Sequence, residues 1–400
     1  MERLSKRIRT ISPSLTLAIS AKAKAMKAAG EDVVNFGVGE PDFNTPEHII
    51  KAAEDALERG CTKYTPAAGL PELRSAICDK FARDNGLEYE PSQIIVSNGA
   101  KHSIFNVCFA LLEPGEDEEV IIPAPYWLTY PEVVRTCGGV PVIVNTSKKN
   151  HFKITPEELR AAVTPKTKLF IFNSPCNPTG AVYTEEEVRA LAKVCEETGI
   201  FVLADEIYEK LVYGNERPFS MAAVSPKMKE QTITVNGVSK TYAMTGWRIG
   251  YLAAPHDIAK AISSFQSHAT SNPNSIAQYA TIKALNSPEA SVEEMVARFA
   301  RRRLALIERV SEMKDVYCII PDGAFYAMLV VSSTYGKSFG SHKITDSVSF
   351  SEVLLDAAKV AVVPGKAFGA DDCVRLSYSL SMKDMLEGLE RIDAFVQSLN

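Results

Sequence analysis

One stretch decides how this chain is arranged: Gln231-Thr-Ile-Thr-Val-Asn-Gly-Val-Ser-Lys-Thr-Tyr-Ala-Met-Thr-Gly-Trp-Arg-Ile-Gly250. Residues 232–235 favour a buried β-strand, Asn236-Gly237 ends it, and a second strand is expected beyond Arg248. Lys240 therefore lies in a loop at the end of a buried strand, where α/β proteins commonly hold ligands. Desolvation in such a place lowers the pKa of a lysine, so that its neutral amine becomes available to attack an aldehyde.

The second half of this stretch is similar to a known cofactor segment. Taken alone, a lysine in a turn is more often a solvated surface residue, but Ser239-Lys-Thr-Tyr-Ala-Met-Thr-Gly-Trp-Arg-Ile-Gly250 resembles the cofactor-lysine segment of class I (fold-type I) aminotransferases that use pyridoxal phosphate (PLP). The resemblance implies that Lys240 binds PLP covalently and that Arg248 grips its phosphate with paired donors. Many relatives have a phosphate-binding serine where this chain has Gly237, and Ser239 is the candidate to replace it.

Length and composition indicate an ordinary globular enzyme. The 400 residues are enough for a large core and two domains, and a net charge of -5 suggests neither nucleic acid nor an acidic membrane as a partner. No apolar run approaches transmembrane length. The eight cysteines are scattered without C-x-x-C pairs, so we expect no disulfide framework and no metal site, and a reducing, cytoplasmic location.

Apolar strand patterns alternate with helical patterns through the first two thirds of the chain, as in a parallel sheet. With the resemblance, this predicts an α/β fold of type I, in which a mostly parallel seven-stranded sheet lies between helices and a smaller α/β domain follows. We expect an N-terminal segment at 1–40 that joins the small domain, a large PLP-binding domain at 41–288 and the small domain at 289–400. Thr45 is expected to cap the helix that Pro46 begins.

The turn Asn98-Gly-Ala-Lys101 lies between a predicted strand and a predicted helix. Such a turn offers free backbone N–H groups to a phosphate, although many α/β loops look alike. The resemblance places phosphate binding at Gly99 and Ala100, beside Lys101. Trp127, at the end of another strand, is either a packing residue or a flat surface for the pyridine ring. The resemblance assigns this stacking to Trp127 rather than to Tyr126.

Two further strand ends carry residues expected on the PLP ring. Asn177 lies in the loop Asn173-Ser-Pro-Cys-Asn-Pro-Thr-Gly180, for which a simple turn is the alternative, because Asn and Pro favour turns. Asp205 follows an apolar strand and would be costly to bury without a cation. The resemblance implies that Asp205 keeps the ring nitrogen protonated, and that Asn177 and Tyr208 hydrogen-bond the phenolic oxygen.

Three positions are expected to face substrate or the partner subunit. The loop Gly37-Val-Gly-Glu-Pro-Asp-Phe43 lacks the third glycine of a dinucleotide fingerprint, and the resemblance brings the amide of Gly39 near the substrate carboxylate. Arg375 is either a surface charge on an edge strand or, as the resemblance implies, the fork that binds the α-carboxylate. Tyr64 matches a residue that reaches the phosphate in the neighbouring subunit, which implies a homodimer with active sites at the interface.

Substrate choice is expected to depend on Lys101. Aspartate and glutamate need a cation for their second carboxylate, and the subgroup that the chain resembles, I-beta, can supply it from this position, helped here by Thr16. A solvated lysine near a helix start is the alternative. We therefore expect ping-pong transamination between L-aspartate and 2-oxoglutarate, giving oxaloacetate and L-glutamate. Prephenate also carries a second carboxylate, so a bifunctional, arogenate-forming aspartate/prephenate aminotransferase stays open, as does an aromatic preference.

Overall fold

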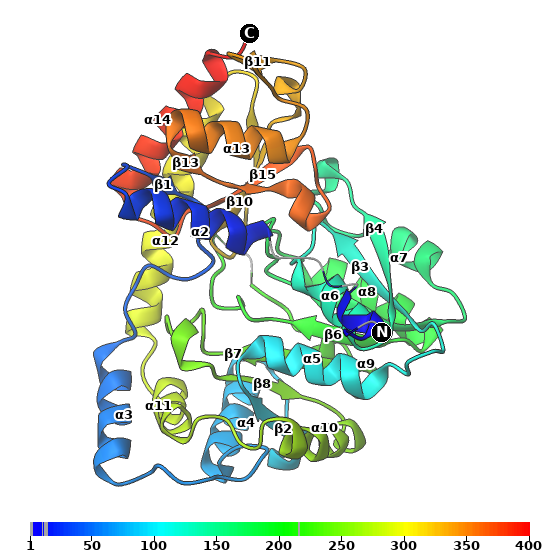
Figure 1. Ribbon diagram of the computed structural model, residues 1–400. Helices are drawn as coiled ribbons and strands as arrows, with labels where there is room; N and C mark the ends of the chain where they lie inside the picture. The colour runs from blue at the N-terminus through cyan, green and yellow to red at the C-terminus, as the bar shows by residue number, and fades with distance from the viewer. Residues whose placement is uncertain (1–2, 10, 12–14, 215–216) are drawn as a thin grey trace.

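The computed structural model describes residues 3–9, 11, 15–214 and 217–400. Its lower part in Figure 1 is a seven-stranded sheet covered by helices, and a smaller α/β part lies above it. The order of the large sheet is β2 (Ile94–Ser97), β8 (Gly250–Ala253), β7 (Thr232–Gly237), β6 (Phe201–Asp205), β5 (Thr167–Asn173), β3 (Glu119–Ala124) and β4 (Val140–Asn145). Among the described strands of this sheet, β8 alone runs in the opposite direction to the others, so the predicted, mostly parallel seven-stranded sheet is confirmed.

Side chains of the large sheet alternate between two helical layers. In β5, Ile171 packs among residues of α5, α6 and α10, whereas Phe170 and Phe172 pack among residues of α7, α8 and α9. The helices of this part are α3 (Glu47–Glu58), α4 (Pro71–Asn85), α5 (Ala100–Leu111), α6 (Thr129–Thr136), α7 (Pro156–Ala162), α8 (Glu185–Thr198), α9 (Pro226–Gln231), α10 (His256–Ala269) and α11 (Ser275–Leu285). Because helices bury both faces, polar side chains reach open space at the carboxyl ends of the strands.

The smaller part is built on an antiparallel sheet in the order β14 (Val363–Pro364), β15 (Cys373–Ser377), β10 (Tyr326–Val330) and β9 (Tyr317–Ile319). Its other strands are β1 (Val34–Asn35), which pairs in parallel with β13 (Val360–Ala361), and the pair β11 (Ser338–Phe339) and β12 (His342–Lys343). Its helices are α2 (Leu15–Ala28), α12 (Ala290–Ser311), α13 (Ser347–Ala358) and α14 (Met382–Gln397), whereas α1 (Lys6–Arg9) lies against α6 of the large part.

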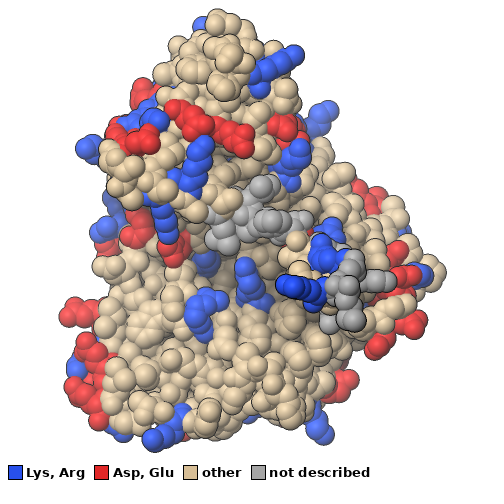
Figure 2. Space-filling model, in the orientation of Figure 1, with Lys and Arg blue, Asp and Glu red and all other residues tan. Residues whose placement is uncertain are grey.

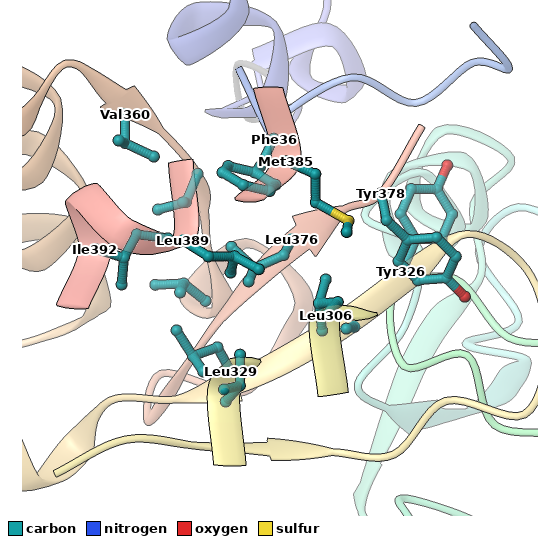
Figure 3. Packing of buried hydrophobic residues seen from close by; sticks show 14 of the residues in the cluster. Phe36, Leu306, Tyr326, Leu329, Val360, Leu376, Tyr378, Met385, Leu389 and Ile392 are labelled. Carbon is teal, nitrogen blue, oxygen red and sulfur yellow. The ribbon is translucent and has the colours of Figure 1, made fainter. Parts of the chain in front are cut away.

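The core of this smaller part includes residues from both ends of the chain. Figure 3 shows Phe36, which follows β1, beside Met385 of α14, with Leu376 of β15 and Leu306 of α12 in the same cluster. The N-terminal segment is thus packed into a core that C-terminal residues complete. The exact domain boundaries predicted from the sequence stay a prediction.

Hydrogen bonds tie the two parts together around the loop 37–43. Asp42 forms a bidentate ion pair with Arg302 of α12, with oxygen to nitrogen distances of 2.6 and 2.7 Å. The hydroxyl of Ser379 donates to the carbonyl of Glu40 at 2.7 Å. On the other side, the Lys240 ammonium donates to the carbonyl of Gly39 at 2.6 Å. This loop therefore lies between the two parts and contacts both.

One local prediction is wrong, and the reason is a tertiary contact. Helix α3 begins at Glu47 with Pro46 in the capping position, and no side chain caps it. The hydroxyl of Thr45 instead donates to the carbonyl of Ala243 at 2.8 Å and accepts from the indole N–H of Trp247 at 2.9 Å. Thr45 thus fixes the loop after Lys240 rather than the helix. Within the described ranges, no helix is long and apolar enough to cross a membrane.

Candidate active site

A cavity of about 520 Å³ lies where the carboxyl ends of the large sheet meet the smaller part. Figure 2 shows Lys and Arg side chains gathered around the middle of this face of the molecule. Most of the predicted site residues line this one cavity: Gly39, Ala100, Lys101, Trp127, Asn177, Asp205, Tyr208, Ser239, Lys240, Arg248 and Arg375. Segments far apart in the sequence therefore meet as the motifs predicted.

Lys240 lies in the turn after β7, as expected. Burial lowers the pKa of its ammonium to about 8, and the nearby guanidinium groups of Arg375 and Arg248 act in the same direction, while the carboxylate of Glu40 opposes them. The neutral amine is therefore accessible near physiological pH. This is the property that a nucleophilic lysine needs.

Asp205 is the last residue of β6 and is 2% exposed. Burial raises the pKa of its carboxyl to about 6, while hydrogen bonds from Tyr130 and from the amide of Ile207, together with the charge of Lys240, lower it. The hydroxyl of Tyr130 donates to Asp205 at 2.7 Å. A carboxylate held in this way retains affinity for a cationic partner in the cavity.

Two groups of hydrogen-bonded side chains lie in the cavity wall. The hydroxyls of Tyr208 and Tyr326 lie 3.0 Å apart, and Arg375 donates to the side-chain oxygen of Asn177 at 3.0 Å and to the carbonyl of Gly37 at 3.1 Å. Arg375 is 3% exposed, and its Nε has no hydrogen-bond partner in the described part of the chain. Since β15 lies between β14 and β10, Arg375 is an interior residue and the edge-strand alternative is wrong.

The phosphate corner is shaped by two glycines. A Cβ atom on Gly99 would lie 2.3 Å from Nη2 of Arg248, and one on Gly250 would lie 2.1 Å from the amide nitrogen of Ala100. The guanidinium of Arg248 is fixed by donating to the carbonyl of Thr245 at 2.8 Å and to that of Asn98 at 3.3 Å. The guanidinium of Arg248 and the backbone of the first turn of α5 thus lie around one small space. Positive charge and helix N-terminal N–H groups make such a space suitable for an anion.

Lys101 and Trp127 form a pair at the cavity wall. The ammonium of Lys101 lies 4.8 Å from the centre of the Trp127 ring, and partial burial together with the charge of Arg248 lowers its pKa. Trp127 also packs edge-on against Tyr130, with 5.5 Å between ring centres. Tyr126 does not line the cavity and its amide instead donates to the carbonyl of Phe368.

Two predicted positions do not line the cavity, and the side chain of a third lies outside the described part of the chain. Gly99 lies directly beside it, through its contact with Arg248. Tyr64 is 90% exposed in the loop before α4, away from the residues that line the cavity of its own chain. The side chain of Thr16 lies outside what the structure describes.

Comparison with known proteins agrees with this geometry. The sequence model of the family "Aminotransferase class I and II" matches residues 31–392. The chain is 50% identical to an aspartate aminotransferase of Geobacillus stearothermophilus over 99% of both chains, and 46% identical to an aspartate/prephenate aminotransferase of Cereibacter sphaeroides over the full length of both. A solved aspartate aminotransferase of Thermus thermophilus with maleate has a TM-score of 0.92 and 44% identity, covering 98% of this chain and 100% of that one.

The chain belongs to the class I and II aminotransferases. It is an aminotransferase, and PLP is its cofactor. The residues present fit this group. Lys240 would supply a reactive amine, Asp205 an anion for the ring nitrogen and Trp127 a flat surface, and the turn at Gly99 together with Arg248 would hold the phosphate.

Sequence reasoning missed four residues that shape the aminotransferase site. Tyr130 and Asn173 hold Asp205, the first through its carboxylate and the second by donating to its backbone carbonyl at 2.9 Å. Tyr326 contacts Tyr208, and Glu40 lines the cavity. Glu40 and Asn173 stand inside motifs quoted above and Tyr130 lies three residues after Trp127, so their position near a predicted residue was the signal available.

Proposed function

We propose that this enzyme transfers the amino group between L-aspartate and 2-oxoglutarate, giving oxaloacetate and L-glutamate. The observation that carries the proposal is the presence in one cavity of two different cations suited to carboxylates, Arg375 and Lys101. Its relatives are named as aspartate or aspartate/prephenate aminotransferases, and one solved neighbour, from Thermus thermophilus, is named with maleate, a dicarboxylate.

Arg375 is suited to the carboxylate that all amino-acid substrates share. It is buried, it is fixed by Asn177 and Gly37, and its Nε is left free for an acceptor. A guanidinium binds a carboxylate through two parallel hydrogen bonds, which also fixes the orientation of the substrate. The amide of Gly39, in the adjacent loop, would complete this end of the site.

Bound PLP supplies an electron-accepting ring that stabilises negative charge on the substrate Cα. Asp205 holds a proton on the ring nitrogen, and the hydroxyl of Tyr208 and the side chain of Asn177 donate toward the phenolic oxygen. Lys240, with its lowered pKa, takes the Cα proton at Nζ and returns it as a general acid. Because two substrates use one site in turn, the kinetics are ping-pong.

Lys101 is proposed to select dicarboxylic substrates, because it is the cation nearest to the indole face of Trp127. In Lys101→Ala, kcat/KM for aspartate should fall about 10- to 100-fold, as expected for loss of a charged hydrogen bond, while kcat/KM for phenylalanine changes little. Lys260→Ala, at an exposed position on α10, is the control. An equal fall for both amino acids would show that Lys101 does not select substrates.

Prephenate is a second candidate acceptor. The specific observation is the full-length match, at 46% identity, to the Cereibacter sphaeroides aspartate/prephenate aminotransferase. The same cation, Lys101, would serve the second carboxylate of prephenate. Direct assay of the enzyme with glutamate or aspartate as donor and prephenate as acceptor decides whether arogenate forms.

Assembly and location complete the proposal. We propose a cytoplasmic homodimer, in which Tyr64 of each chain reaches the phosphate site of the other. Two observations support it: Tyr64 is 90% exposed, and the eight cysteines are all free thiols. The loop that carries Tyr64 is held by Gln278, which donates to the hydroxyl of Thr65 at 3.1 Å and accepts from the amide of Leu70 at 2.8 Å. Ser239 is proposed as an additional phosphate donor.

A further inference from the structure

The turn that follows β6 has two buried sides. Asp205 and Tyr208, three residues apart, line the cavity. Glu206 and Glu209, also three residues apart, are only 4% and 6% exposed, yet they are not among the residues that line it. Burying carboxylates costs free energy unless they are paired or hydrogen-bonded, and the proposed reaction does not use these two.

Glu209 connects the turn to the end of α4. It forms an ion pair with Lys80, which is 3% exposed. The amide of Asn85 donates to Glu209 at 3.0 Å, and Lys80 donates to the amide oxygen of Asn85 at 2.7 Å, so the three side chains form a closed triangle. The next residue of the turn, Lys210, lies 3.1 Å from the carboxylate of Asp84. The turn and the helix are thus joined by charged side chains.

Glu206 anchors the start of the same turn. Its carboxylate accepts from the hydroxyl of Ser220 at 2.7 Å, and its amide donates to the carbonyl of Val235 in β7 at 2.9 Å. Burial, together with the neighbouring charge of Glu209, raises the pKa of the Glu206 carboxyl to about 7. Hydrogen bonds of this kind become stronger and more rigid in a buried setting, provided that every member is satisfied.

We propose that Glu209 with Lys80, and Glu206 with Ser220, are positioning residues that hold the turn 205–211 from behind. By fixing this turn they would set the positions of the Asp205 carboxylate and the Tyr208 hydroxyl relative to bound PLP. The inference rests on the function proposed above. Backbone hydrogen bonds hold the turn internally, such as the one from the amide of Glu209 to the carbonyl of Glu206 at 3.0 Å. On the side away from the cavity, the side chains of Glu206 and Glu209 connect the turn to its neighbours.

The test is Glu209→Gln in the PLP-loaded enzyme, since glutamine keeps the shape but leaves the buried Lys80 ammonium with the more distant carboxylate of Asp84, at 3.8 Å, as its nearest counter-charge. The pH midpoint of the visible PLP absorption band reports the surroundings of the ring and should shift by about half a pH unit, because the nearby charge and hydrogen bonds move. The value of kcat should fall about tenfold from misplacement of Asp205 and Tyr208, with KM for aspartate within about threefold.

Glu187→Gln is the matched control, because it breaks the Lys153–Glu187 ion pair, whose members do not contact the turn. It should lower Tm without moving the midpoint. If Glu209→Gln behaves like this control, with unchanged midpoint and kcat, the pair is merely structural and the inference fails. If Glu209→Gln does not fold, the double variant Lys80→Met/Glu209→Gln, which removes both charges, is read by the same criteria. A wild-type enzyme without a visible band would instead refute the proposed function.

Discussion

Gly250→Ala should strongly weaken PLP binding, because the phosphate turn lies against the Cα atom of Gly250. The added Cβ would lie 2.1 Å from the amide nitrogen of Ala100 and 2.4 Å from the carbonyl carbon of Gly99. Both are backbone atoms, so no side-chain rotation relieves the contact. Restoring van der Waals distance requires the turn to retreat by about 1.3 Å, which exceeds the tolerance of N–H···O hydrogen bonds. Two charge-assisted bonds lost at about 1.5 kcal/mol each correspond to an increase of about 100-fold in the Kd for PLP.

The assay is titration of the PLP-free protein with PLP, followed by the visible absorption band. Gly246→Ala is the matched control, since Gly246 lies in the turn just before β8 and a Cβ there meets no atom within 4 Å. It should bind PLP as the wild type does, and circular dichroism checks that both variants fold. If Gly250→Ala binds PLP within about threefold of the wild type, the close packing of the turn does not govern the phosphate site and the reasoning is refuted.

Three further predictions follow from groups in the same cavity. Arg375→Lys should lower kcat/KM for aspartate about 10- to 100-fold while the PLP band stays unchanged, because lysine lacks the paired donors; unaltered steady-state kinetics would contradict this. The rate at which the PLP-free protein takes up PLP should rise with pH, and the midpoint of this rise should lie at about pH 8, since the Lys240 amine is protonated below that pH. A midpoint near pH 10 would contradict the lowered pKa. In Tyr130→Phe the pKa of Asp205 should rise further above about 6, because a hydrogen bond that lowers it is lost. A carboxyl whose pKa is higher in the folded than in the unfolded state stabilises the fold below its unfolded pKa, and this contribution is lost as pH rises through the folded pKa. The Tm deficit of PLP-free Tyr130→Phe should therefore be larger at pH 7 than at pH 4, and equal deficits would count against the role of Tyr130.

The sequence sufficed for features that depend on local pattern. Apolar runs that end in a polar motif placed Asn177, Asp205 and Lys240 at neighbouring strand ends, and the structure brings these three to one cavity. Helix α8 shows why such predictions succeed. Thr184 and Glu187 form a capping box at its start and Gly199 adopts a left-handed conformation at its end, so the signals in the sequence determine both bounds.

Features that depend on distant partners were not predictable from local pattern. Arg375 could be read as an edge residue because its strand gains its second neighbour, β14, only through the tertiary register that pairs Val363 with Arg375. Thr45 looked like a helix cap, yet it bonds to Ala243 and Trp247, some two hundred residues away. The contact of Tyr130 with Asp205 likewise joins an element after β3 to the end of β6. No spacing within one segment contains this information.

The pairing of β1 with β13 has a consequence for the order in which the enzyme matures on the ribosome. Val34 of β1 pairs with Val360 of β13, so the first strand to be synthesised cannot form this pairing until most of the chain has been made. The large sheet, by contrast, is complete in sequence once residue 253 has emerged, and domains generally fold as units in the order of synthesis. Lys240 and Arg248 are then present while Arg375 has not yet been made. The residues proposed to hold the cofactor are thus synthesised before the arginine proposed to hold the substrate.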